Sequence, residues 1–351
     1  MPTNTNGEIF GRGPVHSKNR SPTVAARMVC AVAALLLGCQ APTRATIPRE
    51  ATFFKGVNFT AEWPAPYESD AAVETLRKLP EFGINAIALV PYAAARLGSP
   101  ELRFPLGMEK DEGIRRISQA AHEVGLRVIL KPQVWYRGGY PGEQELQTDE
   151  QLDAFFARYG ELVAHYARLA EETHADLFCV GVEFAKLTRH EERWRELIRV
   201  ARRHYSGPLT YAANFGEEFE SVGFWDELDY VGLDNYYPLP DDLSTAANAR
   251  RIETVYGRFG KPVIFTEVGF SSYEGTHKRP WEDEPGGAYS AQAQALGYEA
   301  IFRGFHDKPW LQGMFWWKVG TNGMSEPGRD GAHAPWGKPA MDVLKDWYLK
   351  L

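Results

Sequence analysis

Two glutamates, Glu183 and Glu267, stand at the ends of apolar runs of strand length, residues 176–184 and 262–270. A carboxylate at the end of a buried strand is costly to desolvate unless another group satisfies or uses it. If these strands are parallel and form a barrel, their carboxyl ends lie on the face that carries active sites. Two carboxylates facing each other there can cleave a glycosidic bond, one protonating the leaving oxygen and the other attacking the anomeric carbon.

The remaining sequence predicts the scaffold that would position this pair. Apolar runs alternate with amphipathic stretches, and the predicted strands are 53–59, 84–90, 126–134, 177–183, 208–214, 229–235, 262–267 and 311–317. The predicted helices are 71–80, 111–124, 151–172, 191–204, 245–259, 290–306 and 338–350, with at most a short helix in 215–228. Continuous apolar strands in alternation with helices indicate an all-parallel sheet buried on both faces. Eight repeats favour a single α/β domain, a closed (β/α)8 TIM barrel.

The order of the predicted elements places the two glutamates on opposite sides of that barrel. They are 84 residues apart, on the fourth and seventh strands. Three long loops, residues 91–110, 135–150 and 268–289, are expected to project from the same face. No Gly-x-Gly-x-x-Gly follows the first strand, which excludes the usual dinucleotide site.

Composition restricts the class of partner. The chain has a net charge of −7 and becomes more acidic without its first 38 residues, and its body has no basic stretch. Such a charge argues against nucleic acid as a partner. The chain also has 10 Trp, 16 Tyr and 19 Phe. Most of these rings are expected in the core, but flat rings also stack on sugars, so a carbohydrate partner is compatible with them.

Residues 1–39 predict a signal peptide. A basic lead is followed by the apolar stretch 28–38, too short to cross a bilayer but suited to a signal sequence, and then by Cys39. Leu-Leu-Gly-Cys at 36–39 resembles a bacterial lipoprotein box. We therefore expect lipidation of Cys39, a polar tether over 40–51 and an exported protein, either a periplasmic or cell-surface lipoprotein or a secreted one. Cleavage near Ala41 or Ala45, or an uncleaved anchor, is the alternative.

The catalytic domain is then expected to span residues 52–351. Its one cysteine, Cys179, lies in an apolar run, and no disulfide is expected. The histidines lack metal-ligand spacing, and His190 is expected at a helix start. The acidic residues 282–284 are expected in a solvated loop, with a calcium site as the alternative. No metal or cofactor is expected, and the protein is expected to be a monomer.

Seven motifs together resemble a known family. They are Ala-Leu-Val-Pro-Tyr at 88–92, Leu-Lys-Pro-Gln-Val-Trp at 130–135, Phe-Cys-Val-Gly-Val-Glu-Phe at 178–184, Leu-Thr-Tyr-Ala-Ala-Asn at 209–214, the run 224–236 ending in Asp-Asn-Tyr, Gly-Lys-Pro-Val-Ile-Phe-Thr-Glu-Val-Gly at 260–269 and Phe-Trp-Trp-Lys at 315–318. They look like the β-mannanase-type family 113 within the large (β/α)8 clan of retaining glycoside hydrolases. The resemblance covers about residues 52–350.

The resemblance implies roles for the residue pair: Glu183 as acid/base and Glu267 as nucleophile. Physical reasoning is compatible with this order without deciding it, because the acid needs an apolar pocket and the nucleophile needs donors such as Tyr236. Trp317 is expected to be the platform beneath the cleaved sugar, with Trp316 pointing the opposite way. Other residues at or near strand ends that are expected to line the cleft are Lys131, Trp135, Asn58, Tyr92 and Asn214.

One residue departs from the clan pattern. The clan usually has an asparagine before the acid/base, where it binds the sugar 2-hydroxyl, and this chain has Val182. Either Asn214 or Asn58 takes that part, or the contact is missing. The resemblance makes β-1,4-mannan or manno-oligosaccharides the expected substrate. The alternatives are a hydrolase or transglycosylase for another β-glycan of a cell wall or exopolysaccharide, and a non-catalytic sugar-binding lipoprotein.

Overall fold

The computed structural model describes residues 53–323 and 332–351. The predicted signal peptide, the lipidation of Cys39 and the tether lie outside these residues. Within the described ranges, none of the helices is both long and apolar enough to span a lipid bilayer.

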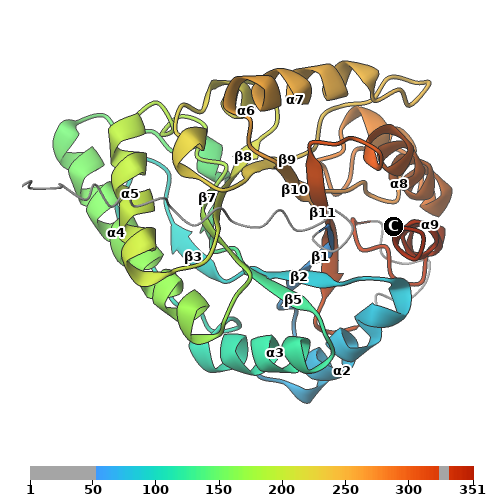
Figure 1. Ribbon diagram of the computed structural model, residues 1–351, viewed down its shortest axis with the longest axis horizontal. Coiled ribbons are helices and arrows are strands. Elements are labelled where there is room, and N and C mark those ends of the chain that lie inside the picture. The colour runs from blue at the N-terminus through green and yellow to red at the C-terminus, as the bar shows by residue number, and fades with distance from the viewer. Residues whose placement is uncertain (1–52, 324–331) are drawn as a thin grey trace, which may run out of the picture. The chain divides into compact units, whose positions relative to one another are not determined.

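Eight parallel strands form a closed barrel, as the sequence predicts (Figure 1). In chain order they are β1 (Phe54–Thr60), β2 (Ala86–Leu89), β5 (Arg127–Leu130), β7 (Leu177–Val182), β8 (Leu209–Asn214), β9 (Val231–Asp234), β10 (Val263–Val268) and β11 (Leu311–Gly320). Hydrogen bonds between β1 and β11 close the ring. Since all eight strands run in the same direction, their carboxyl ends form one face.

Helices surround this ring (Figure 1). They are α2 (Asp70–Lys78), α3 (Asp111–Glu123), α4 (Asp149–Glu172), α5 (Glu191–His204), α6 (Glu217–Ser221), α7 (Ala246–Phe259), α8 (Ala291–Phe305) and α9 (Pro339–Tyr348). Short 3₁₀ turns are η1 (Leu79–Phe82), η2 (Pro141–Glu143), η3 (Trp225–Glu227) and η4 (Thr276–Lys278). Side-chain caps define several starts: Ser69 accepts a hydrogen bond from the Ala72 N–H at α2, and Thr148 from the Gln151 N–H at α4.

The strands bury both of their faces because they separate two apolar layers. The larger layer packs strand side chains such as Val57 and Trp316 against the helices. The smaller layer fills the barrel interior and includes Phe54, Ile264 and Phe315. A Cβ at Gly56 would lie 2.3 Å from the Phe315 ring, so this strand position leaves room for the interior aromatic side chain.

The structure corrects the prediction for two of the long loops. A small sheet with the order β4-β3-β6 occupies part of them, formed by β3 (Tyr92–Ala95), β4 (Leu102–Arg103) and β6 (Gln133–Tyr136). The predicted strand 126–134 is accordingly two strands. Pro132, which has no N–H to donate to a ladder, stands between β5 and β6.

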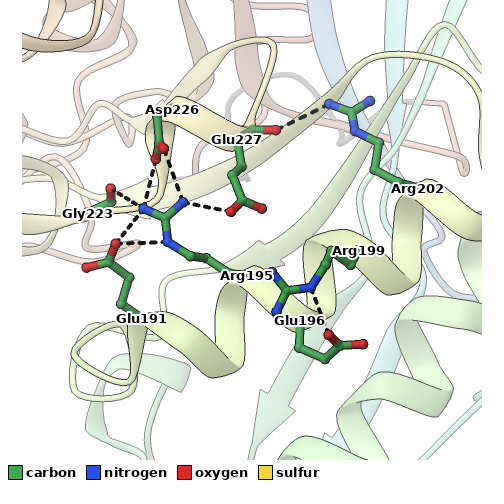
Figure 2. A network of polar contacts seen from close by, with 8 residues as sticks. All are labelled: Glu191, Arg195, Glu196, Arg199, Arg202, Gly223, Asp226 and Glu227. Carbon is green, nitrogen blue, oxygen red and sulfur yellow. Dashed lines mark hydrogen bonds and ion pairs between the residues drawn. The ribbon is translucent and has the colours of Figure 1, made fainter.

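The segment 215–228, which has the weakest pattern of secondary structure in the sequence, is attached to α5 by ion pairs. Arg195 on α5 donates to both carboxyl oxygens of Asp226, at 3.0 and 3.1 Å, and to Glu227 at 2.8 Å (Figure 2). It also donates to the Gly223 carbonyl at 3.2 Å and to Glu191 at 2.5 Å. This network ties the segment that precedes β9 to a long helix, although its helical content is only α6 and η3.

Candidate active site

Glu183 and Glu267 line one cavity of about 610 Å³ that the ends of β7 and β10 share. The other lining residues include Tyr92, Gln133, Trp135, Tyr140, Asn214, Phe215, Tyr236, Trp281, Asp283, Trp317 and His333. The cavity is therefore polar at its centre and aromatic around it, which is the lining that a ring-shaped polar ligand such as a sugar requires.

Three donors hold the carboxylate of Glu267. Lys131 Nζ lies 2.5 Å and Gln133 Nε2 lies 2.7 Å from its Oε1, and the Tyr236 hydroxyl donates to its Oε2 at 2.9 Å. The lysine is fully buried. Burial lowers its pKa, but the negative charges of Glu267 and Asp234 together outweigh this effect, so the net shift of the pKa is upward. Lys131 is therefore a cation that stabilises the ionised form of Glu267.

Glu183 has the opposite surroundings. Burial raises its pKa well above the ordinary range, and the charges of Asp234, Glu267 and Glu218 raise it further. Among the described residues its carboxyl group has no hydrogen-bond partner, whereas its backbone N–H donates to the Ala212 carbonyl at 2.8 Å. The two environments thus differ: Glu183 has a raised pKa, which favours its protonated form, whereas the carboxyl group of Glu267 accepts hydrogen bonds from three donors.

The backbone at Glu183 is strained, with φ at +56°, in the left-handed region that few non-glycine residues adopt. The next residue is anchored, because the Phe184 N–H donates to the Tyr211 hydroxyl at 2.8 Å. Tyr211 in turn donates to the buried Glu218 at 2.5 Å, and Glu218 also accepts from the Asn214 N–H at 2.9 Å. A buried chain of hydrogen bonds from α6 therefore fixes the turn that orients Glu183.

Glu218 is expected to make the stability of the fold depend on pH. Burial raises its pKa to about 8, against the lowering effect of the Tyr211 and Asn214 donors. The unfolded chain releases this proton near pH ~4.3, so the folded state binds more protons between that pH and 8, and stability falls as pH rises through this window. As pH rises through this window, the free energy of unfolding of Glu218→Gln should decline less steeply than that of wild type. The difference between the two slopes is up to ~1.4 kcal/mol per pH unit.

Urea unfolding at pH 5, 6.5 and 8 measures this slope. Glu220→Gln is the matched control, because Glu220 is half-exposed on the same helix and forms an ion pair with Arg251 at 2.7 Å. Equal slopes for wild type and Glu218→Gln would contradict the assignment of the proton to Glu218.

The structure places most of the predicted binding residues in the cavity wall. Trp135, Asn214, Tyr92, Tyr236 and Trp317 all line it. Trp316 points into the helix layer, fully buried and stacked on Tyr298 with ring centroids 3.7 Å apart.

Two predicted cleft residues lie elsewhere. Lys131 and Asn58 are fully buried and do not line the cavity. Lys131 lies behind Glu267, and Asn58 donates to the carbonyls of Thr266 and Phe315 at 3.1 and 3.3 Å. The reason is that both side chains point into the barrel beneath its rim. Of the two asparagines that could replace the missing one at Val182, only Asn214 faces the cleft.

Several residues of the cavity were not predicted. Gln133 follows Lys-Pro after the third barrel strand, and its position in that motif was the only available signal. Trp281 stacks on Phe215, with centroids 5.3 Å apart, and is 44% exposed. No sequence pattern connects these two rings, which come from different loops.

The acidic residues 282–284 lie in a largely exposed loop, as predicted, and one of them also reaches the cavity. Asp283 lines the cavity, and its Oδ1 lies 2.8 Å from Nδ1 of the buried His333. The hydrogen bond from His333 lowers the pKa of Asp283, although burial opposes this shift. The other ring nitrogen of His333 lies 2.7 Å from the Pro280 carbonyl, so the histidine fastens this loop to the cleft rim. Among the described residues, no group of three or more His, Cys, Asp or Glu side chains could hold a metal ion.

Removal of one donor to Glu267 is expected to slow the reaction while leaving the fold intact. Tyr236→Phe should lower kcat for any substrate by roughly 10²-fold, because a preorganised donor in a buried site is worth that much. The matched control is Tyr237→Phe, whose hydroxyl bonds to Glu220 at 3.1 Å. Steady-state kinetics and thermal melting separate the two effects, and a loss of equal size in both variants would contradict the role of Tyr236.

A closed barrel of eight parallel strands, with two glutamates from the ends of β7 and β10 in one cleft, defines a (β/α)8 glycoside hydrolase. The chain belongs to Glycoside Hydrolase Family 113, whose family model matches residues 59–335.

Solved structures agree with this family. The chain is 31% identical to the GH113 β-mannanase AaManA from Alicyclobacillus acidocaldarius in complex with ManMIm, with a TM-score of 0.79 over 86% of this chain and 99% of that one. It is 28% identical to a second GH113 β-1,4-mannanase complex, with a TM-score of 0.79 over 85% and 99% of the two chains. A further GH113 β-1,4-mannanase structure is 29% identical, with a TM-score of 0.77 over 85% and 100%. No curated protein matches the chain.

Proposed function

We propose that this protein is a retaining glycoside hydrolase that cleaves β-1,4-mannan or manno-oligosaccharides. The observation that carries the mechanism is the unequal bonding of the two carboxyl groups. Glu267 accepts from Lys131, Gln133 and Tyr236, as a nucleophile that must stay ionised requires. Glu183 is partly buried beside other carboxyl groups, and desolvation and their charges raise its pKa, as a general acid requires.

The proposed reaction proceeds in two displacements. Glu183 gives its proton to the glycosidic oxygen while a Glu267 oxygen attacks the anomeric carbon, so the bond to the leaving sugar breaks and a glycosyl ester forms. Glu183, now ionised, then takes a proton from water as that water attacks the same carbon. The second step breaks the ester, restores both carboxyl groups and returns the anomeric configuration of the substrate.

Support for the sugar comes from the family and from the β-mannanase names of the similar structures. The cleft contributes Trp317 and the Trp281–Phe215 pair as stacking surfaces and Asn214 and Asp283 as hydroxyl-binding groups. Asn214 is our candidate for the contact to the sugar 2-hydroxyl. Export as a lipoprotein anchored through Cys39 remains part of the proposal and rests on the sequence alone.

A panel of manno-, gluco-, xylo- and chito-oligosaccharides tests the proposal. We expect hydrolysis of the manno-oligosaccharides, and proton NMR of the first product should reveal the β-anomer before mutarotation. Products that appear first as the α-anomer would overturn the double displacement. Cleavage of another sugar alone would overturn the mannan assignment, and sugar binding without cleavage would favour the non-catalytic alternative.

A further inference from the structure

The small sheet β4-β3-β6 is an outward continuation of two barrel strands. β3 follows β2 after Pro91, and β6 follows β5 after Pro132. The ladder continues across both prolines, because the Lys131 N–H donates to the Leu89 carbonyl at 2.8 Å and the Gln133 N–H to the Pro91 carbonyl at 2.9 Å. The sheet therefore rises from the carboxyl-terminal rim of the barrel, next to the catalytic cleft.

One face of this sheet begins at the catalytic centre. Strand side chains alternate between faces, so Gln133 and Trp135 share a face while Val134 and Tyr136 are buried on the other. Gln133 donates to Glu267 at 2.7 Å, and Trp135, 54% exposed, is the next residue outward. We call this surface the outer sheet face; it consists of Gln133, Trp135, Arg137, Tyr92, Ala94, Arg96, Glu101 and Arg103.

Positive charge gathers at the far end of the outer sheet face. Ala94 pairs in register with Trp135 on one side and with Arg103 on the other, which sets the three in one row across the strands. Arg96 and Arg137 are the residues that directly follow β3 and β6. Within the described ranges 53–323 and 332–351, none of these three guanidinium groups has an ion pair or a hydrogen-bond acceptor.

A second cavity, of about 580 Å³, lies over this row. The three arginines, Glu101, Ser99 and Trp135 line it, and Trp135 also lines the catalytic cavity. One exposed indole thus connects the two cavities, and the small Ala94 leaves the space beside it open. A polymer bound at the catalytic centre can extend over Trp135 into a site where arginines outnumber acidic groups, in a chain with a net charge of −7.

We propose that the outer sheet face binds a carboxylate-bearing sugar residue of the same glycan that is cleaved at Glu183 and Glu267. This inference rests on the proposed function and narrows its substrate to an acidic or acid-substituted mannan. Arginine is suited to the part, because its planar fork pairs with a carboxylate through two parallel hydrogen bonds. Trp135 supplies the stacking surface for the intervening ring. Continuity with the catalytic cleft favours a sugar carboxylate over an unrelated anion.

The test compares two substrates that share one backbone: a neutral manno-oligosaccharide and the same oligosaccharide bearing a glucuronic acid branch. Wild type is expected to prefer the acidic substrate by about tenfold in kcat/KM at low ionic strength, with the preference fading as salt rises. The double variant Arg103→Gln/Arg137→Gln should lose that preference and retain the wild-type rate on the neutral substrate. Arg250→Gln, an exposed arginine on α7, is the matched control and should change neither value.

Each outcome decides the inference. A wild type without acidic preference, or a double variant that keeps it, overturns the site, and equal losses on both substrates assign the arginines a structural role instead. Failure of the proposed function gives a different result, since wild type then cleaves neither substrate. In that case calorimetry of the acidic oligosaccharide against wild type and the double variant still tests the site: weaker binding by about tenfold in the variant supports it, and equal binding overturns it.

Discussion

Glu267→Ala is expected to lower kcat on manno-oligosaccharides by on the order of 10⁴-fold or more, because it removes the group that forms the glycosyl ester. The three donors around Glu267 would be left without their acceptor, and the buried Lys131 would lose its ion-pair partner. A second variant is therefore needed in which the volume is kept. Glu267→Gln retains the shape but has little nucleophilicity, and it should be equally inactive.

Chemical rescue distinguishes loss of the nucleophile from loss of the fold. With an activated aryl β-mannoside, azide should restore turnover of Glu267→Ala and give the α-glycosyl azide, since the small anion attacks from the side vacated by the carboxylate. Glu192→Ala, which removes an exposed glutamate on α5, should retain wild-type kinetics and gain nothing from azide. A β-glycosyl azide from Glu267→Ala would contradict its assignment as nucleophile.

Glu183→Gln is expected to have the second-largest effect on kcat. This effect should depend on the leaving group of the substrate, unlike that of Glu267→Ala. On natural oligosaccharides kcat should fall roughly 10³-fold, because the leaving sugar then departs without a proton. An aryl glycoside with an acidic phenol needs no such help, so its ester should form readily and accumulate. Azide should then speed turnover and give the β-glycosyl azide, the opposite anomer to that from Glu267→Ala.

The pH profile provides a separate check on Glu183. Burial, followed by the charges of Asp234, Glu267 and Glu218, raises its pKa above the ordinary range. Only the protonated form acts as an acid, so wild-type kcat/KM should fall as pH rises through this raised pKa. Glu183→Gln has no proton to lose at this position, and its residual rate should lack that alkaline limb. An unchanged alkaline limb in the variant would assign it to another group.

Most of the scaffold was predictable from local pattern. Apolar strands buried on both faces and helices with one apolar side each leave a periodic signature, and the barrel follows from eight alternations of the two. The predicted strand ends were accurate enough to place Glu183 and Glu267 on the same face of the barrel, the one formed by the carboxyl ends of the strands. The error occurred at 126–134, where one strand was predicted straight across Pro132, the residue that lies between β5 and β6.

The surroundings of the two glutamates were less predictable. Tyr236 was expected near Glu267 because both end neighbouring strands, β9 and β10. Gln133 is 134 residues from Glu267 in the sequence. It bonds to Glu267 only because β6 extends from the barrel rim next to that glutamate. Lys131 was placed in the cleft by its position at a strand end, yet its side chain turns inward and is buried.

The sequence by itself determined the eightfold alternation, the strand ends that bear Glu183 and Glu267, and the family motifs. These features depend on residues close together in the chain, whose periodicity records which faces are buried. Only the tertiary structure decided which donors reach Glu267, that His333 fastens Asp283 to the rim, and that Trp135 connects the catalytic cleft to three arginines. The bonds from Lys131 and Gln133 to Glu267 and from His333 to Asp283 join residues 50 or more positions apart. They depend on strand register and loop packing, and neither leaves a local pattern that can be read from composition or spacing.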